Sequence, residues 1–189
     1  SGYLTTEKPA ETAAASGQNA EAGSSASASQ SAGEVGLNMD WKYASMSKIN
    51  SGKAVLYRSE SSARKNKVVC VNAGHGTKGG SSVKTQCHPD GTPKVTSGTT
   101  SAGATTAVAV SGGMTFADGT PEAKVTLSMA RVLKDKLLAR GYDVLMIRES
   151  DDVQLDNVAR TVLANNLADC HIALHWDSTK SNKGAFYMS

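Results

Sequence analysis

Two histidines and one glutamate in this chain have the residue types and positions of a catalytic zinc site. His75 follows the apolar run Val-Val-Cys-Val-Asn-Ala, His175 ends an apolar run, and Glu122 opens a helical pattern. In an open α/β sheet, the carboxyl ends of strands and the starts of helices meet at one edge, where ligands bind. Two histidines and a glutamate also leave the fourth zinc position for water. These residues therefore predict one zinc ion at the edge of a sheet.

Alternating strands and helices must position these residues. Apolar runs predict strands at residues 53–58, 67–72, 142–147, 170–174 and from 184 onward, the first of them at a sheet edge. Apolar residues at helical spacing predict a helix from Pro121 to Gly141 and another over 155–167, the second capped by Asp151 or Asp152. This alternation predicts parallel β-α-β units with right-handed crossovers. We therefore expect a single α/β domain, with a parallel-rich twisted sheet flanked by helices.

The N-terminal part of the chain has a different composition. Residues 5–34 are almost entirely Ala, Ser, Gly, Glu, Gln and Thr, which cannot bury enough apolar surface to offset the entropy of ordering. The sequence therefore predicts a low-complexity disordered tether over residues 1–37. An N-terminal extension that contacts the domain is expected over 38–66, and the zinc hydrolase domain over 67–189.

Composition excludes some partners. The net charge is +3 and the basic residues are scattered, which disfavours nucleic acid. No apolar run reaches the length of a transmembrane helix. The chain begins without Met and shows no charged-then-apolar leader, so we expect a processed or trimmed N-terminus. A tether ahead of a catalytic domain predicts an exported bacterial protein at the cell surface, and we expect a monomer.

Other histidines and the cysteines are weaker candidates for chemistry. His171 lies four residues before His175 on the same strand face, roughly 13 Å away, too far to share one ion. Cys87 and His88 sit in a Pro-Asp-Gly turn without a partner cysteine, so no second metal site is expected. Cys70 and Cys170 are predicted as buried thiols between sheet and helix, with a disulfide possible if their strands are neighbours.

A segment of about forty residues, 78–119, is rich in Gly, Thr and Ser and has little periodic pattern. Loops of this length inside a domain are usually functional, such as lids or binding loops. The sequence therefore predicts that residues 78–119 border a substrate groove.

Four features together resemble zinc-dependent N-acetylmuramoyl-L-alanine amidases, the peptidoglycan hydrolases of bacterial cell walls. They are the strand leading into Asn-Ala-Gly-His-Gly, the glutamate that opens the first long helix, the strand Gly-Tyr-Asp-Val-Leu-Met-Ile-Arg, and the last strand ending in histidine. The resemblance covers residues 67–189. It implies that His75, Glu122 and His175 bind zinc, and that the enzyme cleaves the amide between N-acetylmuramic acid and L-alanine.

The sequence also departs from this family. Trp176 and Asp177 follow the second histidine, where the family often has Asn or Ala. Family members carry a further catalytic glutamate on a later strand, and its absence before Ser189 predicts a domain truncated at its C-terminus. Arg148 is expected to support the site, to bind a substrate carboxylate, or to form a structural ion pair. Two alternative functions remain open: an amidase-like module that binds wall polymer without cutting it, and a zinc carboxypeptidase that acts on the stem peptide.

Overall fold

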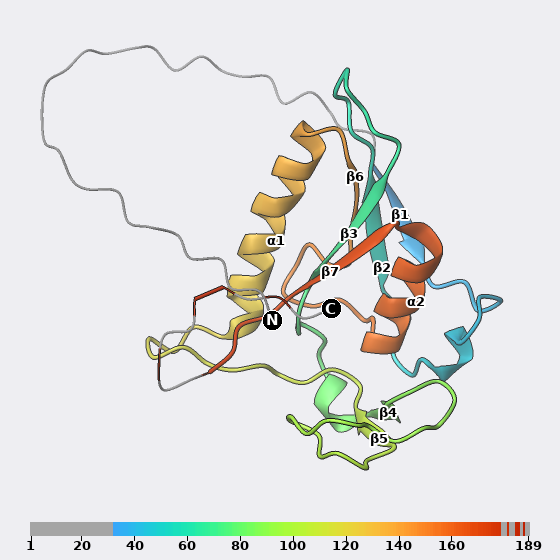
Figure 1. Cartoon of the computed structure of the whole chain (residues 1–189), viewed down its shortest axis with the longest axis vertical. Helices are drawn as coiled ribbons and strands as arrows, with labels where there is room; N and C mark the ends of the chain where they lie inside the picture. Colours follow the sequence, from blue (N-terminus) through green and yellow to red (C-terminus); the bar gives the residue numbers. More distant parts are fainter. Residues whose placement is uncertain (1–31, 179–180, 182–183, 186, 188–189) are drawn as a thin grey trace, which may run out of the picture. The chain divides into compact units, whose positions relative to one another are not determined.

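A computed structural model describes residues 32–178, 181, 184, 185 and 187 of the chain (Figure 1). The elements in chain order are β1 (Ala32–Gly36), η1 (Ala44–Met46), β2 (Lys53–Tyr57), β3 (Val68–Ala73), η2 (Gly80–Ser82), β4 (Lys84–Gln86), β5 (Thr106–Val108), α1 (Glu122–Ala139), β6 (Asp143–Met146), α2 (Asn157–Leu167) and β7 (Cys170–Leu174). All of them lie within one compact unit, Gln30–Asp177. No helix among the described residues is long and apolar enough to cross a lipid bilayer.

The main sheet has five strands in the order β1-β2-β6-β3-β7. β3 lies between β6 and β7 and is parallel to both, whereas β1, β2 and β6 pair in antiparallel fashion. The parallel part therefore contains both strands that lead to the histidines. The predicted α/β fold is confirmed, with a mixed sheet in which β6, β3 and β7 are parallel and β1 and β2 join in antiparallel pairs.

The two helices cover opposite faces of this sheet. Alternate residues of each strand point to opposite sides, so each strand contributes side chains to the core on both faces. On one face, Val69, Val71 and Met146 contact Leu127 and Ala130 of α1 in one buried cluster. On the other face, a second buried cluster joins the sheet to α2; it contains Ala54, Cys70, Leu145, Ile147, Val153, Leu155, Ala159, Leu163 and Ala164. Figure 1 shows α1 and α2 on the two sides of β3. The double-sided burial explains why these strands read as continuous apolar runs.

The sheet begins earlier in the chain than predicted. β1 starts at Ala32, within the range 1–37 assigned to the tether, and it pairs with β2. The prediction that residues 53–58 form an edge strand is therefore wrong, because β2 lies between β1 and β6. Residues 1–31 lie outside the described residues. The strand predicted from residue 184 also falls largely outside them.

The segment 78–119 contains more regular structure than its composition suggested. β4 and β5 pair as a two-stranded antiparallel sheet, with Thr85 opposite Ala107. The short η2 helix precedes β4, and Ala109 and Val110 after β5 are fully or almost fully buried. Their backbone N–H groups donate to the carbonyls of Val83 and Gly80. The end of this segment is thereby fixed against its beginning.

Asp156 caps α2, where the sequence had suggested Asp151 or Asp152. Its carboxylate accepts from the backbone N–H of Ala159 at 2.8 Å, as expected of an N-cap residue. The same carboxylate accepts from the N–H groups of Lys48 and Ile49 and from the Ser47 hydroxyl. The cap prediction was wrong because Asp156 is held in place by Ser47, Lys48 and Ile49, which lie more than one hundred residues earlier in the chain.

Asp143 ties the chain ahead of β3 to the start of β6. Its buried carboxylate accepts from the backbone N–H of Ser59 at 2.9 Å and from Arg64 Nε at 3.0 Å. The adjacent Arg64 guanidinium holds the pKa of Asp143 below its usual value, against the opposing effect of burial, and the Ser59 N–H contributes in the same direction. The ionised carboxylate is therefore the form that stabilises the fold.

Replacing Asp143 with asparagine should lower the free energy of unfolding at neutral pH, because the amide loses the ion pair with Arg64. A depressed folded-state pKa stabilises the fold above the unfolded value of about 3.9, and this stabilisation disappears as the pH falls through the folded-state pKa. Urea unfolding should show a gap between wild type and variant at neutral pH that closes in acid. A gap of equal size at both pH values would contradict this account. Asp135→Asn, at an exposed carboxylate, is the matched control.

Candidate metal centre

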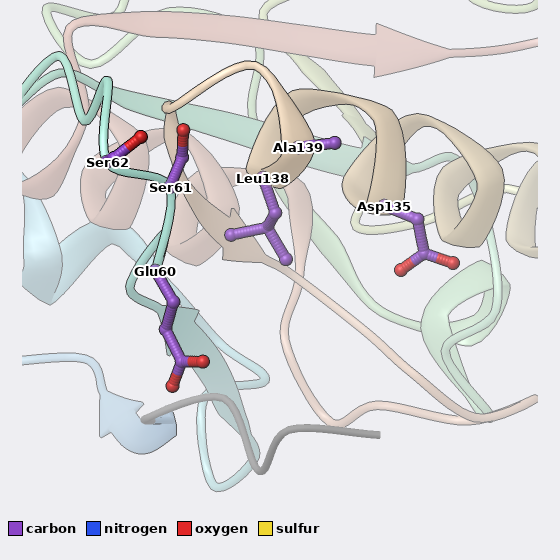
Figure 2. Close-up of a pocket in the computed structure, with 6 residues that line it drawn as sticks. All are labelled: Glu60, Ser61, Ser62, Asp135, Leu138 and Ala139. Carbon is purple, nitrogen blue, oxygen red and sulfur yellow. The ribbon is translucent and has the colours of Figure 1, made fainter. Parts of the chain in front are cut away.

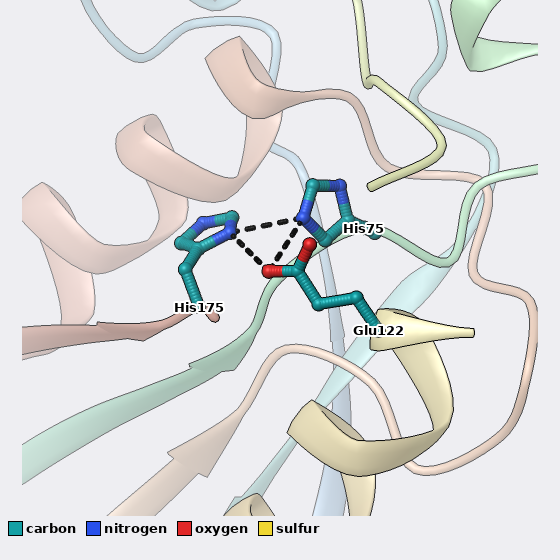
Figure 3. Close-up of side chains that lie close together, drawn as sticks. All are labelled: His75, Glu122 and His175. Atoms are coloured by element: carbon teal, nitrogen blue, oxygen red, sulfur yellow. Dashed lines mark hydrogen bonds and ion pairs between the residues drawn. The ribbon is translucent and has the colours of Figure 1, made fainter. Parts of the chain in front are cut away.

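The carboxyl edge of the parallel strands brings the three predicted zinc ligands together. His75 lies two residues after β3, and His175 directly follows β7. Glu122 is the first residue of α1, which starts at the same edge (Figure 3). These are the places where the strand-end rule had put them.

The donor atoms of the three side chains form a small triangle. His75 Nε2 lies 3.0 Å from Glu122 Oε1 and 3.0 Å from His175 Nδ1, and His175 Nδ1 lies 3.3 Å from Glu122 Oε1. Zinc bonds of 2.0–2.1 Å in a tetrahedron place neighbouring ligand atoms about 3.3 Å apart. The triangle therefore matches one face of a tetrahedral site. Within the described part of the chain, this is the one group of three or more His, Cys, Asp or Glu side chains so arranged.

The proton of His75 is placed by a backbone carbonyl. His75 Nδ1 lies 2.8 Å from the oxygen of Ser111 and 3.2 Å from the Ser111 hydroxyl. Since a carbonyl can only accept, Nδ1 carries the hydrogen and Nε2 keeps its lone pair. Nε2 faces Glu122 and His175 (Figure 3). His75 also has a left-handed backbone with φ of 65°, a conformation uncommon for residues other than glycine and often found at functional sites.

Glu122 is buried, with an exposed fraction of 2%. Its Oε2 accepts from the backbone N–H of Met114 at 2.9 Å and its Oε1 from that of Trp176 at 2.7 Å. Burial alone would raise the pKa of Glu122, but these two N–H groups and His75 together lower it below the usual value. The side chain is therefore held in the charged form, which is the form that binds a cation.

His175 faces the open side of the cluster. Its side chain is 53% exposed, whereas those of His75 and Glu122 are almost completely buried. Burial of the ring and the neighbouring His75 lower the pKa of His175, which favours the neutral ring that coordinates metals. The two imidazole rings meet edge to face, with centroids 4.7 Å apart. A substrate can therefore approach from the side of His175.

Two glycines make room for the cluster. A Cβ atom on Gly74 would overlap His175 Cε1 and would lie 2.6 Å from the oxygen of Leu174. A Cβ atom on Gly113, whose φ is +82°, would lie 2.8 Å from Glu122 Oε2 and 2.8 Å from His75 Cδ2. Contacts this short do not occur in folded proteins, so any side chain at these positions would displace the ligands.

Arg148 holds the backbone next to His75 and is not one of the side chains of the donor cluster. It is 1% exposed and donates to the carbonyl oxygens of Ala73 and Gly74 at the end of β3, and to those of Ala123 and Ser150. A Cβ atom on Gly76 would lie 2.5 Å from Arg148 Nε, so the guanidinium lies directly against this turn. Of the roles expected for Arg148, the geometry favours support of the site over binding of a substrate carboxylate.

Arg160 makes a second set of contacts with the turn that carries His75. This residue was not predicted from the sequence. This α2 residue is 1% exposed and donates to Asn72 Oδ1 and to the carbonyl oxygens of Ala73 and His75. Burial lowers its pKa to about 10, with Arg148 contributing, so it is still charged at neutral pH. The one signal in the sequence was its spacing, three and four residues before Leu163 and Ala164 on the buried helix face.

The weaker candidates lie elsewhere. His171 contacts the amide of Asn72 at 3.2 Å and does not join the cluster. His88 Nδ1 lies 3.0 Å from the oxygen of Thr92 within the Pro-Asp-Gly turn.

Cys70 is buried as predicted, and burial raises its pKa to about 12. The prediction of a buried Cys170 is wrong, because this residue opens the edge strand β7 and is exposed. The neighbouring strands pair Cys70 with His171 and Val69 with Cys170. The two thiols therefore point to opposite faces of the sheet, and both are free.

One hollow on the described surface lies away from this cluster. A cavity of about 450 Å³ lies at the other end of α1, lined by Glu60, Ser61, Ser62, Asp135, Leu138 and Ala139 (Figure 2). Glu122 begins the same helix, and the thirteen residue steps from Glu122 to Asp135 span about 20 Å along it. The residues that line this cavity do not include His75, Glu122 or His175.

An open α/β sheet with two histidines and a glutamate at its carboxyl edge is typical of metal-dependent hydrolases. Residues 69–188, more than half of the chain, match the family N-acetylmuramoyl-L-alanine amidase, and the chain belongs to this family. The family acts as hydrolases on amides of peptidoglycan, the cell-wall polymer. Comparison with curated proteins and with solved structures gave no match.

Proposed function

We propose that His75, Glu122 and His175 hold one zinc ion, and that the chain hydrolyses the amide between N-acetylmuramic acid and L-alanine in peptidoglycan. The observation that carries this proposal is the triangle of donor atoms, with edges of 3.0, 3.0 and 3.3 Å. Family membership over residues 69–188 supports the class of substrate. When bound, zinc supplies Lewis-acid chemistry, which makes water nucleophilic at neutral pH and polarises the scissile carbonyl.

The chain's own residues prepare this site in three ways. The Ser111 carbonyl fixes the hydrogen of His75 on Nδ1 and so leaves Nε2 free to coordinate. The backbone N–H groups of Met114 and Trp176 hold both oxygens of Glu122 in place. The exposed flank of His175 leaves an approach for the substrate. The donor set and its supporting hydrogen bonds therefore fit a zinc site.

The alternative zinc carboxypeptidase is less well supported. Such an enzyme needs a cationic side chain to bind the free carboxylate at the end of its substrate. Arg148, the candidate for that role, is buried and donates to backbone oxygens of the chain itself. We therefore propose cleavage at the sugar-proximal amide, by a monomeric protein acting at the bacterial cell envelope.

The test is hydrolysis of purified disaccharide-peptide muropeptides. We expect release of the whole stem peptide, loss of this activity after chelation, and recovery on addition of zinc. Hydrolysis that persists after complete removal of metal would contradict the zinc mechanism. Release of a single terminal residue would favour the carboxypeptidase. Binding of the polymer without any cleavage would favour the binding module.

A further inference from the structure

Two aromatic rings lie beside the candidate metal centre. Phe116 and Trp176 meet edge to face, with ring centroids 6.3 Å apart and an interplanar angle of 64°. Both residues are partly exposed. They come from distant parts of the chain, since Phe116 closes the 78–119 segment and Trp176 directly follows His175. Neither ring supplies an atom to the cluster of donor atoms.

The carboxylate of Glu122 fixes the backbone that carries each ring. The N–H of Trp176 donates to Oε1 at 2.7 Å, and the N–H of Met114, two residues before Phe116, donates to Oε2 at 2.9 Å. Phe116 itself is held in a tight turn, where its N–H donates to the oxygen of Thr120 at 2.8 Å. The backbone at Trp176 and near Phe116 is therefore held by Glu122 and by the turn before any substrate arrives.

We propose that Phe116 and Trp176 form a subsite for a sugar ring of the glycan strand, a step that rests on the proposed function. The amide to be cut is joined to the sugar through the short lactyl group, so a pyranose ring must lie close to the donor cluster. The C–H faces of a pyranose are apolar and stack on aromatic rings, which offer large rigid surfaces at low entropic cost. Trp176 directly follows His175, whose side chain is 53% exposed, and both rings are themselves partly exposed.

The local charge favours sugar over stem peptide at this subsite. Asp118 and Asp177 lie close in sequence to the two rings, and both are exposed. Stem peptides carry free carboxylates, which these aspartates repel, whereas both N-acetylated sugars of the glycan are uncharged while the lactyl carboxyl of muramic acid is bound in the amide. The pair of rings thus suits the glycan and leaves the peptide to another part of the groove.

Intrinsic fluorescence can test the subsite without catalysis. The chain has two tryptophans, Trp41 and Trp176, and Trp41 contacts the buried cluster on the α2 face. In the variant Trp41→Phe, the remaining signal comes from Trp176. Titration with an uncharged tetramer of N-acetylglucosamine should give a saturable change in emission. Adding Phe116→Ala should weaken this binding by ~10-fold, about 1.4 kcal/mol. No saturable change in Trp41→Phe would overturn the subsite.

Kinetics provide the second test. Trp176→Ala should raise KM for a disaccharide-peptide by ~10-fold and leave kcat and zinc content nearly unchanged, because the backbone N–H that Glu122 uses remains. Trp176→Phe should restore most of the KM. Equal KM values in Trp176→Ala and wild type would overturn the proposal, as would a loss of zinc in parallel with activity.

Sugar binding and amide hydrolysis can fail independently of each other in these experiments. A wild-type protein that binds the sugar tetramer but does not release stem peptide would contradict the proposed hydrolysis and support the subsite. A protein that hydrolyses muropeptides with an unchanged KM after Trp176→Ala would support the hydrolysis and contradict the subsite.

Discussion

Replacing His175 with alanine should abolish zinc binding and hydrolysis and leave the sheet folded. The side chain is 53% exposed, so its removal leaves no large cavity. Its Nδ1 supplies one corner of the donor triangle, and two ligands hold zinc far less tightly than three. The loss of activity should exceed the 10- to 100-fold effect that is typical of removing a supporting partner of a ligand. Zinc content by atomic absorption and stem-peptide release are the measurements.

His171→Ala is the matched control for this prediction. His171 lies on the same strand four residues earlier, is also exposed, and contacts Asn72 instead of the donor cluster. We expect this variant to keep its zinc and its unfolding midpoint close to wild type. If both variants lost zinc equally, the damage would be to β7 as a whole, and His175 would have no special place as a ligand.

The positions of the three donor residues could be predicted because they depend on local patterns. A β-branched run followed by Ala-Gly-His-Gly reads as a strand and a turn, and Pro-Glu before helical spacing reads as a helix start. Parallel strands then force their carboxyl ends to one edge. Each step uses only short stretches of sequence and one rule of topology.

The supporting contacts could not be predicted, because they join segments that are remote in sequence. Ser111 and Met114 reach the cluster from a Gly-rich segment without periodicity, and nothing near them indicates which carbonyl or N–H will face a ligand. The capping role of Asp156 likewise depends on Ser47, which is 109 residues away. The composition of Ala32–Gly36 also gave no indication of β1, since this strand pairs with β2 through backbone groups and not through characteristic side chains.

The two buried arginines show why the turn that carries His75 keeps its unusual shape. Arg148 and Arg160 both donate to the oxygen of Ala73, and Arg160 also donates to the oxygen of His75 itself. His75 has a φ of 65°, and a left-handed backbone costs roughly 1–3 kcal/mol unless the surroundings hold it. The guanidinium groups supply that restraint by fixing the carbonyls on both sides of Gly74.

Replacing Arg160 with methionine should therefore weaken both the fold and the metal site. The apolar side chain fills much of the same space but leaves the oxygen of His75 and the Oδ1 of Asn72 buried without this donor. Each buried oxygen that loses its partner costs about 1–3 kcal/mol, so we expect a destabilisation of ~3–5 kcal/mol in urea unfolding. Zinc affinity of the folded variant should fall by roughly 10- to 100-fold, because the turn is free to leave its left-handed conformation.

Arg140→Met tests whether these effects belong to the buried position. Arg140 is the exposed C-cap residue that follows α1, and its replacement should change the free energy of unfolding by no more than about 0.5 kcal/mol. Arg160→Lys adds a second test, since a lysine keeps the charge but cannot reach Asn72, Ala73 and His75 together. If the lysine variant bound zinc as tightly as wild type, the charge alone would matter, and the argument that planar hydrogen bonding shapes the His75 turn would fail.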